Sequence, residues 1–170
     1  MLAKALFWGS LGALAWTHAG YPLAAGVAAR LRPRPVRKDA AAEPPVTLVV
    51  AAYNEETVIE RRLENLLALD YPPEKLEIVV ASDASTDGTD ELVEAVAARE
   101  PRVRLLACPR GGKVAAQNRA VRETAGEVVA FSDANATWAP DALRRLVANL
   151  ADPEVAYVCG RLRLEAADGS

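Results

Sequence analysis

The sequence predicts an α/β fold, a mostly parallel sheet with helices on both faces, preceded by one apolar N-terminal helix. Two observations predict this sheet. From residue 46 onward, short runs rich in Val, Leu and Ile alternate with segments of helical periodicity, which is typical of repeated βαβ units. The first run, 46–52, is almost wholly apolar rather than alternating, as expected for a strand buried on both faces.

The soluble part is expected to contain five strands and four helices. The strands are expected at 46–52, 76–81, 103–107, 127–132 and 155–159. The helices are expected at 56–69, 90–99, 113–124 and 141–150. Pro72 and Pro73 end the first helix, Gly126 is expected to close the third at its C-terminus, and Pro140 suits the first turn of the last.

The N-terminal segment predicts attachment to a membrane. Residues 5–29 carry no charged side chain and, as a helix, are long enough to cross a bilayer. The basic residues that follow place the C-terminal side of this span in the cytoplasm. We therefore expect a single-pass transmembrane helix at 1–30, a basic, proline-rich linker at 31–45 and a cytoplasmic domain from 46 to 170. A cleaved signal peptide and an amphipathic surface helix are the alternatives.

Charge and composition exclude several functions. Residues 1–38 hold six basic and no acidic side chains, so the remainder has 14 basic against 23 acidic, and an acidic body argues against nucleic-acid binding. His18 is the only histidine and lies in the apolar segment, which excludes a Ser-His-Asp triad or an HExxH zinc site in the rest of the chain. Cys108 and Cys159 are expected to be buried, reduced thiols.

Polar side chains follow the first two strands at the points where they end. Tyr53, Asn54 and Glu55 come directly after the first strand, and Asp83 follows the second. In open α/β sheets, ligands bind beyond the carboxyl ends of the strands. A carboxylate such as Asp83 can accept hydrogen bonds from ribose hydroxyls or from a base N–H. The alternative for the first loop is a plain helix start with Asn54 as its cap.

The fourth strand ends in a similar polar segment. Alternation places Asp133 and Asn135 on the same side of the chain. Two oxygen-bearing side chains at this spacing could hold Mg²⁺ or Mn²⁺, which prefer hard oxygen ligands. A capping loop before the last helix is the alternative.

A glycine pair, Gly111-Gly112, opens the third helix immediately before Lys113. Free backbone N–H groups and a lysine at a helix start could meet phosphates. The segment is not a P-loop, because Ala107 stands where the first glycine is required and Val114 replaces Ser or Thr. A solvated helix start is the alternative for Lys113 and Asn118.

These segments, taken in order as AAYNEE, SDASTDGT, GGKVAAQNRA and FSDANA, resemble the family-2 glycosyltransferases. The resemblance implies a GT-A fold, with its Rossmann-like nucleotide-sugar-binding half, over residues 46 to about 160. It implies donor-nucleotide contacts at a set of residues in these segments. They are Ala51, Tyr53, Glu55, Asp83, Lys113, Asn118 and Asp133. Asp133 and Asn135 occupy the first and last positions of the family's DxD metal motif, so Mg²⁺ or Mn²⁺ is the implied cofactor.

The sequence departs from the family pattern at two points. The usual DDGS reads Ser82-Asp83-Ala84-Ser85, without one carboxylate and the turn glycine, and the DxD ends in Asn135. The family's catalytic base lies well downstream of the DxD, so we expect it beyond residue 170 and assign no catalytic residue here. We expect an incomplete catalytic domain that holds the donor half and does not turn over by itself.

The resemblance implies an inverting, metal-assisted glycosyltransferase of hexosyltransferase type. The expected partners are a nucleotide-diphosphate sugar, with UDP-sugars favoured, and a polysaccharide, glycolipid or related acceptor at a membrane. Two alternatives stay open from the residues alone: a nucleotidyltransferase acting on a sugar phosphate, and a non-catalytic remnant that binds nucleotide sugars.

Overall fold

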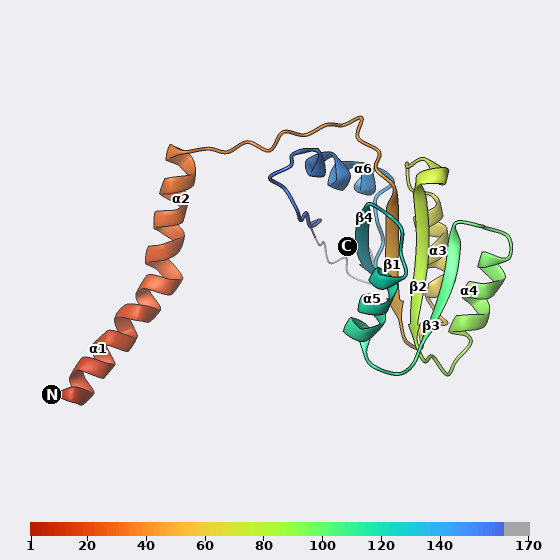
Figure 1. Ribbon diagram of the computed structural model, residues 1–170. Coiled ribbons are helices and arrows are strands. Elements are labelled where there is room, and N and C mark those ends of the chain that lie inside the picture. Colours follow the sequence, from red (N-terminus) through yellow and green to blue (C-terminus); the bar gives the residue numbers. More distant parts are fainter. Residues whose placement is uncertain (162–170) are drawn as a thin grey trace, which may run out of the picture. The chain divides into compact units, whose positions relative to one another are not determined.

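The computed structural model describes residues 1–161, and the chain divides into two units, residues 1–36 and a second unit that begins at Arg37. The first unit is helical: α1 (Leu2–Ala15), a π-helical turn (Trp16–Gly20) and α2 (Tyr21–Leu31) follow one another (Figure 1). Neither α1 nor α2 contains a buried residue.

The predicted transmembrane helix at 1–30 is not supported. Across residues 1–161, no helix combines the length and the apolar character needed to cross a bilayer. The π-helical turn divides this stretch into α-helices of 14 and 11 residues, whereas a span needs about 20.

The second unit is built on a parallel sheet. Its strands are β1 (Val46–Ala52), β2 (Leu76–Asp83), β3 (Val103–Cys108) and β4 (Val128–Asp133), in the spatial order β3-β2-β1-β4 (Figure 1). All three pairings are parallel. The predicted strand at 46–52 is confirmed with the same first and last residues. The next three predicted strands are confirmed to within two residues at each end.

Four helices follow in the predicted places, each shorter than expected. They are α3 (Ile59–Leu67), α4 (Thr89–Ala97), α5 (Lys113–Arg122) and α6 (Ala142–Val147); a 3₁₀ turn lies at Pro73–Lys75 and another, Ala148–Ala151, extends α6. The late start of α3 has a local cause. The backbone N–H groups of Asn54, Glu55 and Glu56 donate to side chains in the loop after β2 and at the start of α4, so this segment does not begin the helix.

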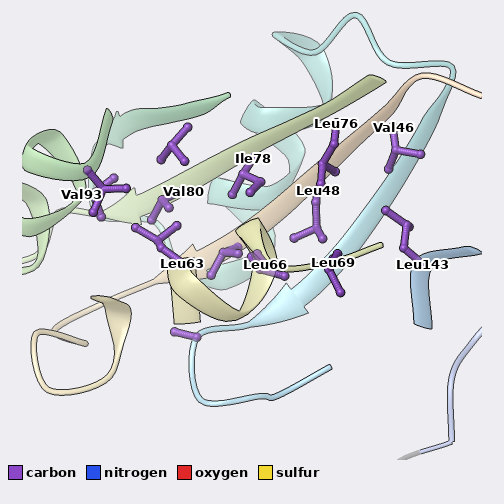
Figure 2. Packing of buried hydrophobic residues seen from close by; sticks show 14 of the residues in the cluster. Val46, Leu48, Leu63, Leu66, Leu69, Leu76, Ile78, Val80, Val93 and Leu143 are labelled. Atoms are coloured by element: carbon purple, nitrogen blue, oxygen red, sulfur yellow. The ribbon is translucent and has the colours of Figure 1, made fainter. Parts of the chain in front are cut away.

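Helices cover both faces of the sheet, as predicted. On one face, Leu63 and Leu66 of α3 pack toward Leu48 and Ile78 of the strands, and Leu143 of α6 joins the same core (Figure 2). On the other face, a smaller cluster is completed by α5. It comprises Val49, Val79, Ala81, Leu106, Cys108, Ala116 and Ala120. All of these β1 and β2 residues are buried, which explains why their strands read as continuous apolar runs.

Three expectations are wrong. The segment 155–159 is not a strand; its Val155 N–H closes a turn to the Asp152 carbonyl, and an apolar run without a neighbouring strand does not form a ladder. Cys159 is exposed, whereas Cys108 is buried as predicted and its burial raises the pKa of the thiol. Gly126 does not close α5, which ends at Arg122.

Candidate functional site

A cleft of about 330 Å³ lies at the carboxyl edge of the sheet. The parallel register brings this edge together, because Ala51 pairs with Asp133 of β4 and Ala52 with Ser82 of β2. The cleft is lined from the ends of β1, β2 and β4 and from the start of α5. Its residues are Ala51, Ala52, Tyr53, Glu55, Asp83, Arg110, Gly112, Lys113, Asp133, Ala134 and Asn135.

The structure therefore brings almost all of the predicted site residues to one place. Ala51, Tyr53 and Glu55 from the first segment lie at the cleft, together with Asp83, Lys113, Asp133 and Asn135. Asn118 is the exception. It is exposed on α5, more than a helical turn beyond Lys113, and does not line the cleft.

Asp83 organises the loop that leads into α5. Its side chain is only 4% exposed, and both carboxylate oxygens accept hydrogen bonds. The Nη1 of Arg110 donates to Oδ2 at 2.6 Å, the N–H of Gly111 donates to Oδ1 at 2.7 Å, and the N–H of Gly112 reaches both oxygens at 2.9–3.0 Å. A buried carboxylate needs such donors, so Asp83 fixes the glycine loop.

Arg110 lies over the ring of Tyr53, with its guanidinium carbon 3.4 Å from the ring centroid. The same guanidinium pairs with Asp83, so one cation joins the ends of β1 and β2. An aromatic face that stacks with a planar cation also stacks with planar rings. Tyr53 is 42% exposed and lines the cleft, and a planar ring stacking on the face under Arg110 would have to displace that guanidinium.

Lys113 and Asp133 form an ion pair across the cleft. Lys113 is the first residue of α5, and Asp133 is the last residue of β4. Both side chains are about half exposed, so the pair is open to a ligand that competes for either partner. The sequence indicated both residues but gave no sign that they face each other.

The loops after β1 and β2 are joined by reciprocal hydrogen bonds. The Oδ1 of Asn54 accepts from the N–H of Thr86 at 2.8 Å, and the Oε2 of Glu56 accepts from the N–H of Gly88 at 2.9 Å. Asn54 therefore does not cap α3. It adopts a left-handed backbone with φ of 54°, which asparagine tolerates better than most residues.

Asp87 and Thr89 serve this local structure. The Oδ1 of Asp87 accepts from the N–H of Thr89 at 3.0 Å, and its Oδ2 accepts from the N–H of Glu56 at 3.2 Å. Burial raises the pKa of the Asp87 carboxyl, but the hydrogen bonds from the Thr89 hydroxyl and from these two N–H groups outweigh it and lower the pKa below its usual value.

A buried arginine beneath the site was not predicted. Arg62 of α3 is 1% exposed and donates to Ser132 Oγ and to Asn65 Oδ1, both at 2.5 Å. Burial lowers its pKa to about 10, and the Asp133 charge opposes that shift. The sequence could have indicated this burial, because the helical spacing places Arg62 on the same apolar face of α3 as Ile59, Leu63 and Leu66.

Two oxygen-bearing side chains, Asp133 and Asn135, are available for a cation at the cleft. Within residues 1–161 there is no cluster of three or more His, Cys, Asp or Glu side chains that could hold a metal alone. A two-residue oxygen set fits Mg²⁺ or Mn²⁺, because such ions commonly bind to one or two side chains and complete their shell with water and substrate phosphates.

Residues 47–169 match the Glycosyl transferase family 2. The chain belongs to this family. The sequence is 36% identical over 144 residues to the beta-monoglucosyldiacylglycerol synthase of Nostoc, and 32% identical over 120 residues to the poly-beta-1,6-N-acetyl-D-glucosamine synthase of Staphylococcus aureus. These matches cover 82% and 70% of this chain but only 31% and 29% of the relatives. The chain thus spans less than a third of either enzyme.

Solved glycosyltransferases share the fold. The mannosyltransferase PcManGT of Pyrobaculum calidifontis, in complex with GDP-Man and Mn²⁺, is 41% identical with a TM-score of 0.70, over 84% of this chain and 44% of that protein. Staphylococcus aureus TarS with UDP-GlcNAc is 29% identical with a TM-score of 0.54, over 59% of this chain and 29% of that one. The GT-A-like sheet expected from the sequence is therefore confirmed.

Proposed function

We propose that this family-2 chain is the donor-binding part of an inverting, metal-assisted glycosyltransferase. Its donor would be a nucleoside-diphosphate sugar, and its acceptor a polysaccharide or a glycolipid. One observation carries the proposal. A single cleft joins an aromatic face at Tyr53, a cation at Lys113 and the oxygen pair of Asp133 and Asn135. The relatives named as glycolipid and polysaccharide synthases support the acceptor class.

Each group has a role in this proposal. Tyr53 would stack with the base, and Glu55 and Ala51 would border the nucleoside. Lys113 would neutralise charge on the diphosphate, which gains one negative charge when its bond to the sugar breaks. A divalent cation bound to Asp133 and Asn135 would act as a Lewis acid on the same leaving group. Asp83 supports the site by holding Gly111 and Gly112.

The Lys113–Asp133 pair gives the donor site a defined resting state. In this resting state, Lys113 forms an ion pair with the Asp133 carboxylate, which would otherwise bind the divalent cation. Arrival of a cation and a diphosphate together would exchange one ion pair for two, because Asp133 gains the metal and Lys113 gains a phosphate. This coupling predicts that nucleotide and metal bind more tightly together than separately.

The proposal is tested by calorimetric titration of the 170-residue chain with UDP and with GDP, each with and without Mn²⁺. We expect one of the two nucleotides to bind, at least about tenfold more tightly with Mn²⁺, and Asp133→Asn to remove that enhancement. Glu94→Gln, an exposed carboxylate change on α4, is the matched control. No binding of either nucleotide, or an unchanged enhancement in Asp133→Asn, would refute the proposal.

We further propose that residues 1–31 attach the chain to a membrane, with the catalytic domain on the cytoplasmic side. The support is chemical: large apolar side chains of this segment are exposed, among them Phe7, Trp8, Leu11 and Trp16, and basic residues follow directly. Burial of these apolar side chains in lipid lowers the free energy of such a segment. Flotation with anionic vesicles tests this, with a chain starting at Arg37 as the control. Equal flotation of the two chains would refute it.

A further inference from the structure

Arg62 and Asn65 of α3 hold both ends of the loop that carries the candidate metal ligands. At the start of this loop, Arg62 Nη2 donates to Ser132 Oγ at 2.5 Å. At its end, Asn65 Nδ2 donates to the Trp138 carbonyl and Asn65 Oδ1 accepts from the Trp138 N–H, both at 2.9 Å. Arg62 also donates to Asn65, so the two side chains form one unit.

The segment between these anchors, 133–137, contains Asp133 and Asn135. Ala134 between them is 3% exposed and belongs to the main core. Ser132, Ala134 and Trp138 are fixed by these contacts. This restricts the exposed side chains of Asp133 and Asn135 to orientations toward the cleft. Ligand oxygens must be held close to the productive geometry for a cation to bind well, and this arrangement supplies that constraint.

The cost of burying Arg62 argues that this unit is more than core packing. Arg62 is 1% exposed and makes no ion pair within the described residues, and its Nε is buried without a hydrogen-bond partner. A buried guanidinium whose contacts are neutral oxygens and the nearby ring of Trp138, 5.5 Å from its Cζ, is costly to fold. An apolar side chain would suit this position of the α3 stripe better if stability alone mattered.

Resting on the proposed function, we propose that Arg62, together with Asn65, is a positioning residue that holds the loop after β4 so that Asp133 and Asn135 can bind a divalent cation with the donor. Arg62 touches neither donor nor metal in this role. It acts through Ser132 and, by way of Asn65, through Trp138. The positions sit one helical turn apart on α3, which is what allows a single helix to hold both ends of the loop.

Electrostatics and positioning predict opposite signs for removal of the Arg62 charge. If Arg62 acted only as a charge, its loss would remove a cation near Asp133, and Mn²⁺ would bind more tightly. If Arg62 positions the loop, its loss releases Asp133 and Asn135, and Mn²⁺ binds more weakly. The direction of the change in metal affinity therefore separates the two roles.

The experiment uses the 170-residue chain as wild type, Arg62→Met, Arg62→Lys, Asn65→Ala and the control Arg61→Met, which changes the exposed neighbour on α3. Calorimetry measures affinity for UDP and GDP with and without Mn²⁺, and electron paramagnetic resonance measures free Mn²⁺. We expect metal-free nucleotide affinity within about twofold of wild type, and a loss of at least about tenfold in the Mn²⁺ enhancement for Arg62→Met and Asn65→Ala. Arg62→Lys should recover part of it, and Arg61→Met should match wild type.

Several results would overturn the inference. An unchanged Mn²⁺ enhancement, or tighter Mn²⁺ binding in Arg62→Met, would exclude positioning, and so would an equal loss of metal-free and metal-dependent binding. If Arg62→Met does not fold, judged by circular dichroism, Asn65→Ala decides, since it removes the Trp138 contacts without changing charge. Failure of the wild type to bind either nucleotide refutes the proposed function itself; normal wild-type binding with unaffected variants refutes only this inference.

Discussion

Individual residues at the cleft have roles that depend on their partners. Asp83 was predicted to contact a nucleoside, yet its oxygens are occupied by Arg110, Gly111 and Gly112. A nucleoside hydroxyl would have to share these oxygens with donors already in place. The same carboxylate therefore has a structural task that the residue type alone did not reveal, and its contact with a nucleoside stays a prediction.

Lys113 is the residue whose change should affect ligand binding most simply. Lys113→Met removes the only positive charge that pairs with Asp133 among the described ion pairs and, in the proposed donor site, would leave the diphosphate without its lysine partner. We expect affinity for a nucleoside diphosphate to fall about tenfold, since a hydrogen bond to a charged group contributes about 1.5–3 kcal/mol. Calorimetric titration measures it. Arg122→Met, at the far end of α5, is the control, and equal affinities in both variants would contradict the assignment.

Ala84 occupies a backbone conformation that suits glycine. Its φ is 57°, at the position where the family pattern has a glycine. A left-handed conformation destabilises a residue with a Cβ by about 1–2 kcal/mol. A glycine at this position would avoid that strain, but its greater conformational entropy in the unfolded chain would offset part of the stabilisation.

We therefore expect Ala84→Gly to raise the free energy of unfolding by about 0.5–1 kcal/mol in urea titrations. Ala95→Gly, at an exposed position within α4, should instead lower it by about 1 kcal/mol. A loss of stability in Ala84→Gly would show that the left-handed backbone carries no strain for alanine.

The limits of helices and strands depend on close contacts with neighbouring strands as much as on the sequence pattern of each element. Gly126 was expected to close α5, but it lies where a Cβ would come within 2.7 Å of the backbone nitrogen of Thr47 and 2.6 Å of its Oγ1. The glycine therefore permits β4 to begin beside β1. The hydrogen bond from the Val128 N–H to the Pro45 carbonyl begins this pairing immediately afterward.

Gly126→Ala should destabilise the pairing of β4 with β1. Because a Cβ there meets the Thr47 backbone nitrogen as well as its side chain, we expect a loss of about 1–3 kcal/mol in the free energy of unfolding. Urea unfolding followed by circular dichroism measures the loss. Gly160→Ala is the matched control, since a Cβ there has nothing within 4 Å; equal stabilities of the two variants would contradict the contact.

The segment 155–159, predicted as a strand, shows where a local sequence pattern fails. Val155 is partly buried, but Tyr157 is 82% exposed and Cys159 is also exposed. A short apolar run forms a strand only if a neighbour supplies the ladder, and within residues 1–161 none pairs with this segment. By contrast, β1, whose limits were predicted, pairs with β2 on one side and with β4 on the other.

At the scale of the whole molecule, stability should depend on pH through Tyr71. Its hydroxyl donates to the Pro44 carbonyl at 2.6 Å, and burial, with a smaller contribution from Glu43, raises its pKa from 10.0 to about 12. Below pH 10 the tyrosine is protonated in both folded and unfolded chains, so its contribution is complete. Between pH 10 and about 12 the unfolded chain loses the proton first, so stability falls.

We therefore expect the free energy of unfolding to decrease between about pH 10 and about pH 12, and Tyr71→Phe to be less stable at neutral pH with a shallower decrease over that range. Urea titrations at several alkaline pH values measure the slopes. Tyr157→Phe, at an exposed position, should keep the wild-type slope. An equally steep decrease in Tyr71→Phe would assign the alkaline loss to other groups.

The sequence by itself determined the parallel sheet, because strands that are buried on both faces consist of continuous runs of apolar residues. It also determined that the site lies at one edge of the sheet, because the carboxyl ends of parallel strands lie on the same side. It thereby predicted that Tyr53, Asp83 and Asp133 would meet. Only the tertiary structure decided that Lys113 pairs with Asp133, that Asp83 holds a glycine loop and that Arg62 lies beneath the site. Periodicity is local to each element, whereas these contacts join residues that are up to 70 positions apart, and their partners are fixed only when the elements pack.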